Sequence, residues 1–201
     1  MPVVALALFA AFAAVGFGWR SWVQWRHTGS TGFNGVSGRP GSPEWFAGAG
    51  FLVSIAAAVA APALQWAGVV APIAALQLPP IQWLGIALAV LGIGGTATAQ
   101  LQMGDSWRIG VDPGETTALV RTGVFGWVRN PIFTAMLVFG AGIALVTPNG
   151  VAILGFLLLL ITIQMQVRLV EEPYLLTRHG ESYRDYLVGV SRFLPGIGRR
   201  T

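Results

Sequence analysis

Five long apolar runs alternate with polar segments along the chain. They have roughly 16 to 23 residues each, close to the length that crosses about 30 Å of hydrocarbon as a helix rising about 1.5 Å per residue. The runs are Val3–Trp19, Trp45–Leu64, Ile81–Met103, Ile132–Thr147 and Val151–Val170. The pattern predicts an all-α integral membrane protein with about five transmembrane helices, in which residues 1–201 form a single membrane domain.

The charged residues are confined to three of the polar segments. Every Arg, Asp and Glu lies within residues 20–44, 104–131 or 168–201, whereas residues 65–80 and 147–150 carry no charge. Five spans place the three charged segments on the same side of the bilayer, and arginine-rich segments favour the cytoplasmic side. We therefore predict that the N-terminus is external and that the C-terminus is cytoplasmic.

The composition of the chain excludes several kinds of partner and of chemistry. Hydrophobic residues make up 54% of the chain and charged residues 10%, so lipid is its main solvent. The net charge of +4 comes from arginines scattered among acidic residues, without a basic stripe, and therefore predicts no nucleic-acid partner. Because cysteine is absent, disulfides, thiolate metal sites and cysteine nucleophiles are excluded. The first run lacks the basic start of a signal peptide, and we interpret it as a span.

The C-terminal part predicts a helical hairpin followed by an amphipathic helix. The segment Thr147–Gly150 reads Thr-Pro-Asn-Gly, a tight turn, so the fourth and fifth runs must be antiparallel neighbours. The fourth run is close to the lower length limit for a span. Residues 171–186 are charged, with Tyr183 and Tyr186 three apart on one helical face. This helix is predicted to lie against the membrane surface or to cap the bundle.

Ionisable residues at the membrane boundary are the candidates for chemistry. His27 and His179 lack zinc-ligand spacing and no G-x-S-x-G elbow is present, so neither a metal site nor a serine hydrolase is predicted. Glu171 and Glu172 directly follow the last apolar run, where carboxylates are unfavourable and oppose the helix dipole. We predict that they bind a cation or an ammonium group. The alternative is that they pair with Arg168 at a helix end.

A second candidate is an anion site at the start of the fourth run. Pro131 restricts Asn130 to extended geometry, and the helix that follows offers free backbone N–H groups, beside Arg129, to an anion such as a carboxylate. The alternative is an ordinary positive-inside arginine at a routine helix start. In the third run, Gly92 and Gly94 are compatible with a close contact between helices and, equally, with a functional role.

Four stretches in the second half of the chain occur in a specific order. They are Gly123–Phe133, the pair Glu171-Glu172, Gly180–Tyr186 and Arg192–Pro195. In this order they resemble the isoprenylcysteine carboxyl methyltransferase and phospholipid methyltransferase superfamily of integral membrane enzymes, whose first stretch reads G-x-Y-x-x-x-R-H-P-x-Y. In this chain Phe125 and Phe133 replace both tyrosines, and Asn130 replaces the histidine. The resemblance implies a membrane methyltransferase.

The resemblance also implies a cofactor and the residues that hold it. Similar enzymes bind S-adenosylmethionine with a G-x-G on an earlier span and with the glutamate pair, and the cofactor-binding part implied here is cytoplasmic, in residues 104–131 and 168–201. No catalytic residue and no metal ligand is implied. The implied cofactor-binding residues are Gly92, Gly94, Gly123, Phe125, Arg129, Asn130, Pro131, Glu171 and Glu172.

The implied substrate is a lipophilic small molecule or a lipid that reaches the enzyme from the bilayer. The methyl acceptor stays open between a carboxylate, a thiol, an amine and a hydroxyl, and so does the oligomeric state. Because Asn130 has no titrating imidazole, a base at that position is disfavoured. Two other functions stay open: an NADPH-dependent enzyme similar to membrane sterol reductases, and a non-catalytic membrane scaffold whose glutamates and arginines merely pair.

Overall fold

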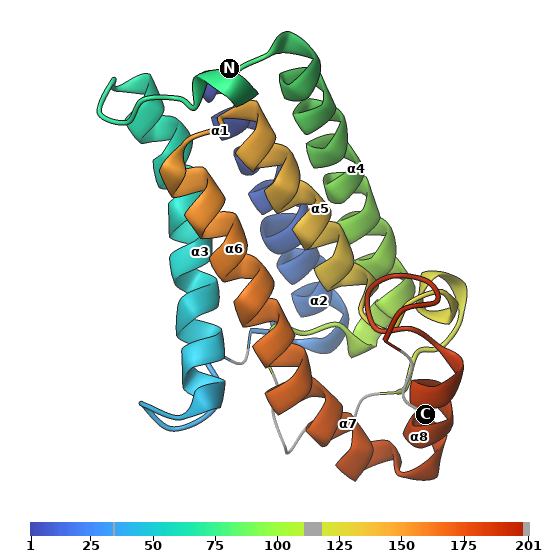
Figure 1. The fold of residues 1–201 in the computed structure, drawn as a ribbon. Helices are drawn as coiled ribbons and strands as arrows, with labels where there is room; N and C mark the ends of the chain where they lie inside the picture. Colours follow the sequence, from blue (N-terminus) through green and yellow to red (C-terminus); the bar gives the residue numbers. More distant parts are fainter. Residues whose placement is uncertain (34, 111–117, 199–201) are drawn as a thin grey trace.

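The chain runs back and forth between the two ends of a helical bundle (Figure 1). A computed structural model describes residues 1–33, 35–110 and 118–198, and within these residues there are isolated β-bridges but no strand. The first rod consists of α1 (Pro2–Ala13), the π-helical η1 (Ala14–Trp19) and α2 (Arg20–Thr28). Next come α3 (Pro43–Trp66), α4 (Pro79–Met103) and α5 (Pro131–Val146). The last rod consists of α6 (Gly150–Met165), the π-helical η5 (Gln166–Glu171) and α7 (Glu172–His179), and α8 (Glu181–Gly189) follows it.

Four helical stretches are long and apolar enough to cross a membrane. They are Pro2–Thr28, Pro43–Trp66, Pro79–Ser106 and Gly150–His179. Large apolar side chains point outward from these stretches, such as Trp83, Leu91 and Leu154, which are 64%, 66% and 68% exposed. A water-soluble protein would bury them, so the protein is an integral membrane protein. The 16 residues of α5 span only about 24 Å, so the predicted count of about five spans is not confirmed for this helix.

The predicted hairpin between α5 and α6 is confirmed, and its turn is buried. Asn149 caps α6, because its side-chain oxygen accepts a hydrogen bond from the backbone N–H of Ala152 at 2.9 Å. Its amide nitrogen donates to the side-chain oxygen of Gln65 at 2.8 Å, which connects the turn to the end of α3. Pro131 occupies the first turn of α5, as predicted.

Two helices extend beyond the ends that hydropathy predicts. The first is predicted to stop at Trp19 but continues to Thr28. The helix can include Arg20 because the guanidinium of this residue donates hydrogen bonds to Gln24 and to the carbonyl of Gly104. The fifth is predicted to stop at Val170 but continues through α7. The expectation that the two glutamates mark a helix end is therefore wrong.

Both extended rods contain a turn of π-helix. In the last rod this turn, η5, comes just before Pro173. In a regular α-helix the proline ring would collide with the carbonyl of Leu169, four residues earlier, and would leave that carbonyl without a donor. The wider turn relieves this collision. In the first rod the corresponding turn, η1, contains two glycines.

Glycines set the distance between α4 and α5. A Cβ atom on Gly92 would lie 2.6 Å from the backbone nitrogen of Phe139, and one on Gly142 would lie 2.6 Å from the carbonyl oxygen of Gly85. The two backbones therefore touch, which is how small residues hold membrane helices together. The ring of Phe139 also stacks on Phe12 of α1, with centroids 4.1 Å apart, so the first rod joins the same core.

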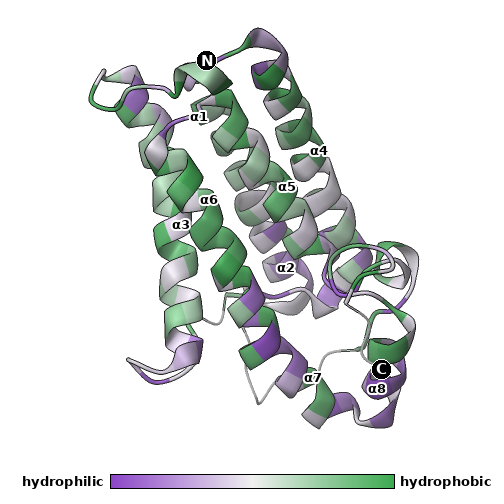
Figure 2. Ribbon diagram, in the orientation of Figure 1, coloured by the Kyte–Doolittle hydropathy of each residue, from purple (hydrophilic) through white to green (hydrophobic). Residues whose placement is uncertain are grey.

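The described charged residues gather at one end of the bundle (Figure 2). At this end the backbone N–H of Ile109 donates to the carbonyl of Gly32 at 2.6 Å. At the opposite end, which is uncharged, Ile73 donates to Pro148 at 2.7 Å. Residues 111–117 and 199–201 of the predicted cytoplasmic part lie outside the described residues.

The predicted amphipathic face belongs to α8. Tyr183, Tyr186 and Leu187 are buried on it, with Leu119 and Leu175 packed against them. The helix therefore packs against α7 and the loop before α5 at the charged end of the chain's fold.

Candidate functional site

A cavity of about 250 Å³ lies inside the bundle towards its charged end. Its walls come from the first rod, α3, α4, α5, the last rod and α8, together with the loops before α3 and after α4. Much of the wall is apolar, with Phe12, Phe17, Phe51 and Met136 among the lining residues. Leu52, which lines the cavity from α3, is 52% exposed. The apolar wall therefore includes an exposed side chain of a helix that is long and apolar enough to cross a membrane.

Charged side chains line the other side of the cavity. Of the described lining residues, the charged ones are Arg108, Arg129 and Glu171. Glu171, the last residue of η5, is half-buried, and the amide of Gln166 donates to its carboxylate at 3.5 Å, the limit for a hydrogen bond. The charge of Arg108 interacts with that of Glu171, and its guanidinium lies over the ring of Tyr174, 4.9 Å from the centroid. The cavity thus offers both a carboxylate and a guanidinium.

The first rod fixes the loop that carries Arg108. Arg20 is buried, donates to the carbonyl of Gly104 and lies over the ring of Trp107, 4.7 Å from its centroid. Gln24 donates to the next carbonyl in the loop at 2.8 Å. Because this loop lies between α2 and the cavity, these contacts determine where the guanidinium of Arg108 can reach.

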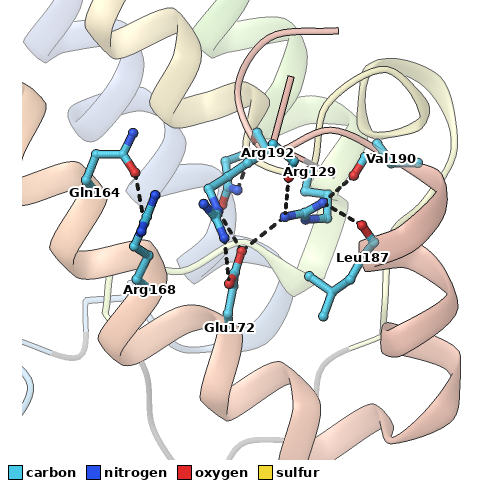
Figure 3. Close-up of polar contacts among 9 residues, drawn as sticks. Arg129, Gln164, Arg168, Glu172, Leu187, Val190 and Arg192 are labelled. Atoms are coloured by element: carbon cyan, nitrogen blue, oxygen red, sulfur yellow. Dashed lines mark hydrogen bonds and ion pairs between the residues drawn. The ribbon is translucent and has the colours of Figure 1, made fainter. Parts of the chain in front are cut away.

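Glu172 has a different environment from its neighbour. Its side chain is 1% exposed, and Arg192 binds it with two hydrogen bonds, from Nε to Oε1 at 2.8 Å and from Nη2 to Oε2 at 3.1 Å. Arg129 donates to the same carboxylate at 3.1 Å and also to the carbonyls of Leu187 and Val190. Figure 3 shows both guanidinium groups pointing at Glu172. This cluster connects α7, the start of α5 and the C-terminal segment.

Two tyrosines of α8 line the cavity near Phe125. The hydroxyl of Tyr186 donates to the carbonyl of Phe125. Burial raises the pKa of Tyr186 to about 12, and burial together with the nearby charge of Glu172 raises the pKa of Tyr183 well above its usual value. Both phenols are therefore neutral at physiological pH, and that of Tyr186 is a hydrogen-bond donor.

Comparison with known sequences decides the family. The sequence model of the phospholipid methyltransferase family matches residues 80–182, just over half of the 201-residue chain. The chain belongs to the phospholipid methyltransferase family. No curated protein sequence matches it significantly.

The fold supports the same assignment. The structure of the eukaryotic intramembrane Ras methyltransferase, isoprenylcysteine carboxyl methyltransferase, superimposes with a TM-score of 0.61 at 19% sequence identity. The match covers 98% of this chain and 70% of that chain. The superfamily that the sequence motifs predict is thus confirmed, and this member of the phospholipid methyltransferase family is an integral membrane methyltransferase.

The cavity collects some of the predicted site residues of this methyltransferase. Those that line it are Phe125, Arg129, Asn130, Pro131 and Glu171. Four others lie elsewhere: Gly92, Gly94, Gly123 and Glu172. The glutamate pair and the Arg-Asn-Pro stretch, which the sequence presents as two candidates, are joined in space by the contact between Arg129 and Glu172.

Two of the three predicted cofactor-binding glycines have surroundings that indicate a structural role. Gly92 faces α5, so the close helix contact that the sequence left open describes it, whereas Gly94 is exposed and a methyl group added to it would have nothing within 4 Å. Gly123 has a φ of +59°, and a side chain there would collide with the amide of Gln102. That amide accepts a hydrogen bond from the backbone N–H of Val124 at 2.8 Å. Gly123 thus allows a helix-end side chain to hold the following turn.

The structure corrects two expectations from the sequence, one about the ion pairs of the glutamates and one about the backbone of Asn130. Arg168 does not neutralise the glutamates, because it is exposed and its Nε donates to Gln164 at 3.3 Å, whereas Glu172 pairs with Arg129 and Arg192. Asn130 is not fully extended, since its φ and ψ are −125° and 58°. Its amide donates to the carbonyl of Arg192 at 3.2 Å and so holds the C-terminal segment beside α5.

The sequence analysis did not single out five polar residues that line the cavity: Ser37, Thr96, Gln100, Arg108 and Gln166. Thr96 and Gln100 could have been predicted from the sequence. They are polar residues four positions apart in an apolar run, which places them on one helix face. Arg108 lies in a loop whose path depends on contacts with α2, so no local pattern indicates it.

Proposed function

We propose that this membrane methyltransferase transfers a methyl group from S-adenosylmethionine to a lipophilic small molecule or lipid. The observation that carries the proposal is the cavity, which combines charged side chains with an apolar wall that includes the exposed Leu52 of a membrane-spanning helix. A water-soluble methyl donor and a lipid acceptor need a site with both properties in order to meet.

The residues on the charged side suit the amino-acid part of S-adenosylmethionine. The carboxylate of Glu171 would accept hydrogen bonds from its ammonium group, and the guanidinium of Arg108 would donate to its carboxylate. Glu172 and Arg129 are less suited, because they already bind each other and the C-terminal segment. We therefore assign cofactor binding to Glu171 and Arg108, with Phe125, Asn130 and Pro131 as further contacts from the cavity wall.

The proposed methyl transfer does not require a strong base from the protein. When bound, the cofactor supplies an electrophilic methyl group, and an in-line displacement depends mainly on alignment and on exclusion of water. The apolar wall excludes water, and the neutral phenols of Tyr183 and Tyr186 cannot take up a proton. Glu171 is the only carboxylate among the described lining residues. An acceptor that must lose a proton would therefore transfer it to Glu171 or to water.

The proposal includes an orientation. The charged end of the bundle would face the cytoplasm, with an external N-terminus and a cytoplasmic C-terminus, and the chain would form one membrane domain. The arginines at this end support it through the positive-inside rule.

Calorimetry on the detergent-purified protein tests the proposal directly. We expect saturable binding of S-adenosylmethionine and S-adenosylhomocysteine and no binding of NADPH. Glu171→Gln should weaken cofactor binding by about 1–3 kcal/mol because a charge-assisted hydrogen bond is lost. Glu181→Gln is the matched control, since Glu181 is exposed and forms a surface ion pair with Arg184.

The other outcomes separate the alternatives. Equal affinity in wild type and Glu171→Gln would refute the role of Glu171. Binding of NADPH alone would indicate a reductase, and binding of none of the three ligands would favour a non-catalytic scaffold.

A further inference from the structure

Two polar side chains of α4 line the cavity from inside the bundle. Thr96 and Gln100 are four residues apart and only 2% and 3% exposed. Thr96 lies seven residues before Met103, the last residue of α4, which is roughly 10 Å along the helix at about 1.5 Å per residue. Thr96 is therefore inside the apolar part of the bundle, and Gln100 lies one helical turn closer to the charged end.

The hydrogen-bonding capacity of this pair is only partly used. The Nε2 atom of Gln100 donates to the carbonyl of Gly16 in the π-helical η1 at 2.8 Å, which directs the amide nitrogen towards the first rod. The Oε1 atom of Gln100 and the hydroxyl of Thr96 have no hydrogen-bond partner among the described residues. Buried polar atoms without partners are unfavourable, and native proteins rarely retain them unless a ligand or water completes them.

The surroundings restrict what could complete them. Phe12 and Phe17 of the first rod line the cavity as well, and the charged lining residues described above come from the loops and from η5. A charged ligand group next to Thr96 would lose its hydration without gaining a counter-charge. The Oε1 atom of Gln100 can only accept a hydrogen bond, so the ligand group must donate one.

We infer that Thr96 and Gln100 form a subsite for a neutral hydrogen-bond donor, a hydroxyl or an N–H, on the lipophilic methyl acceptor. This inference rests on the proposed function, because it takes the apolar part of the cavity to hold the acceptor. The subsite selects amphiphiles that carry such a donor along an otherwise apolar body. A purely hydrocarbon body would leave both polar atoms of the protein without partners.

Photolabelling tests this selectivity. The photoprobe is a long-chain primary alcohol with a diazirine in its chain, and its methyl ether serves as the comparison because it cannot donate a hydrogen bond. In the wild type we expect the alcohol to label α1 and α4 peptides saturably and about tenfold more efficiently than the ether, the ratio expected from one buried hydrogen bond. Thr96→Val should reduce this ratio severalfold, because one of the two polar partners of the alcohol is lost, and Thr96→Ser should restore it.

Thr98→Val is the matched control, because Thr98 lies on the same helix but is exposed. This variant should keep the wild-type ratio. Partitioning of the two photoprobes into the micelle is the same for all variants, so it cancels when their ratios are compared. Equal labelling by alcohol and ether in the wild type, or an unchanged ratio in Thr96→Val, would overturn the inference and would indicate that a buried water completes the two polar atoms.

Calorimetry with S-adenosylmethionine on the same variants separates this inference from the proposed function. Thr96→Val should bind the cofactor as the wild type does. A loss of cofactor affinity in Thr96→Val would overturn the inference, because the pair would then serve the cofactor. If the wild type prefers the alcohol but binds no S-adenosylmethionine, the subsite stands and the proposed methyl donor fails.

Discussion

Replacing Glu172 by glutamine should destabilise the protein strongly, whereas the same change at Glu171 should leave its stability almost unaltered. The carboxylate of Glu172 is buried and accepts three hydrogen bonds of 2.8–3.1 Å from Arg129 and Arg192. Removing one partner of a buried ion pair costs about 3–5 kcal/mol, because the other charge stays buried without compensation. Glutamine keeps the shape and one acceptor oxygen, so we expect a loss at the lower end of that range, about 3 kcal/mol.

For Glu171 the expected loss is below about 1 kcal/mol, because its hydrogen bond from Gln166 is 3.5 Å long and the side chain borders the cavity. Unfolding in mixed micelles of increasing denaturing-detergent content, followed by tryptophan fluorescence, measures both losses. The eight tryptophans of the chain provide the signal. Because this measurement of stability needs no ligand, it separates a structural role from a binding role.

A double-mutant cycle with Arg192→Gln makes the test specific. If Glu172 and Arg192 act as a pair, the double variant should lose much less stability than the sum of the two single variants. Additive losses, or equal losses for Glu171→Gln and Glu172→Gln, would refute the assignment of different roles to the two glutamates.

Three further predictions follow from packing, titration and capping. Gly92→Ala should cost about 1–3 kcal/mol in the same unfolding assay, since its methyl group would collide with α5, whereas Gly94→Ala should cost nothing; equal losses would contradict the glycine contact. Because the folded-state pKa of Tyr183 and of Tyr186 is raised, their contribution to stability is complete below about pH 10 and falls as the pH rises towards the folded-state value. In a Tyr174→Phe variant, which leaves only these two tyrosines, tyrosinate absorbance should therefore rise only as the protein unfolds. Asn149→Ala should lower stability by about 1–3 kcal/mol, because a buried helix cap and its contact with α3 are lost, and retention of wild-type stability would argue against the capped turn.

Hydropathy predicts the helices and the ends at which the charges gather, because lipid requires long apolar segments and excludes unpaired charge. It fails at Trp19 and Val170, where helices continue. At both places polar side chains are satisfied by groups far away in the sequence, such as Gly104 for Arg20 and Arg192 for Glu172. A local pattern contains no information about such partners, so it ends each helix too early.

The candidate site shows the same limit at the level of single residues. Motifs indicate Glu171 and Glu172 together but cannot say which of them faces the cavity, because that depends on the rotation of the helix. Likewise a glycine such as Gly92 has the same identity whether it admits a ligand or a neighbouring helix. The polar pair on α4 could have been found, since helical spacing alone places its members on one face.

The π-helical turn η5 is a place where the last rod holds one extra residue. Such a turn closes its hydrogen bonds one residue later than an α-helix does, so the additional residue is taken up within the turn. In an ordinary stretch of α-helix, the loss of one residue rotates everything beyond it by about 100°. Deleting Leu169 from η5 should instead let the turn close as an α-helix while Glu171 and Glu172 keep their directions. The ring of Pro173 would then meet the backbone of the preceding turn, so the deletion should lower stability without exchanging the side chains of the site.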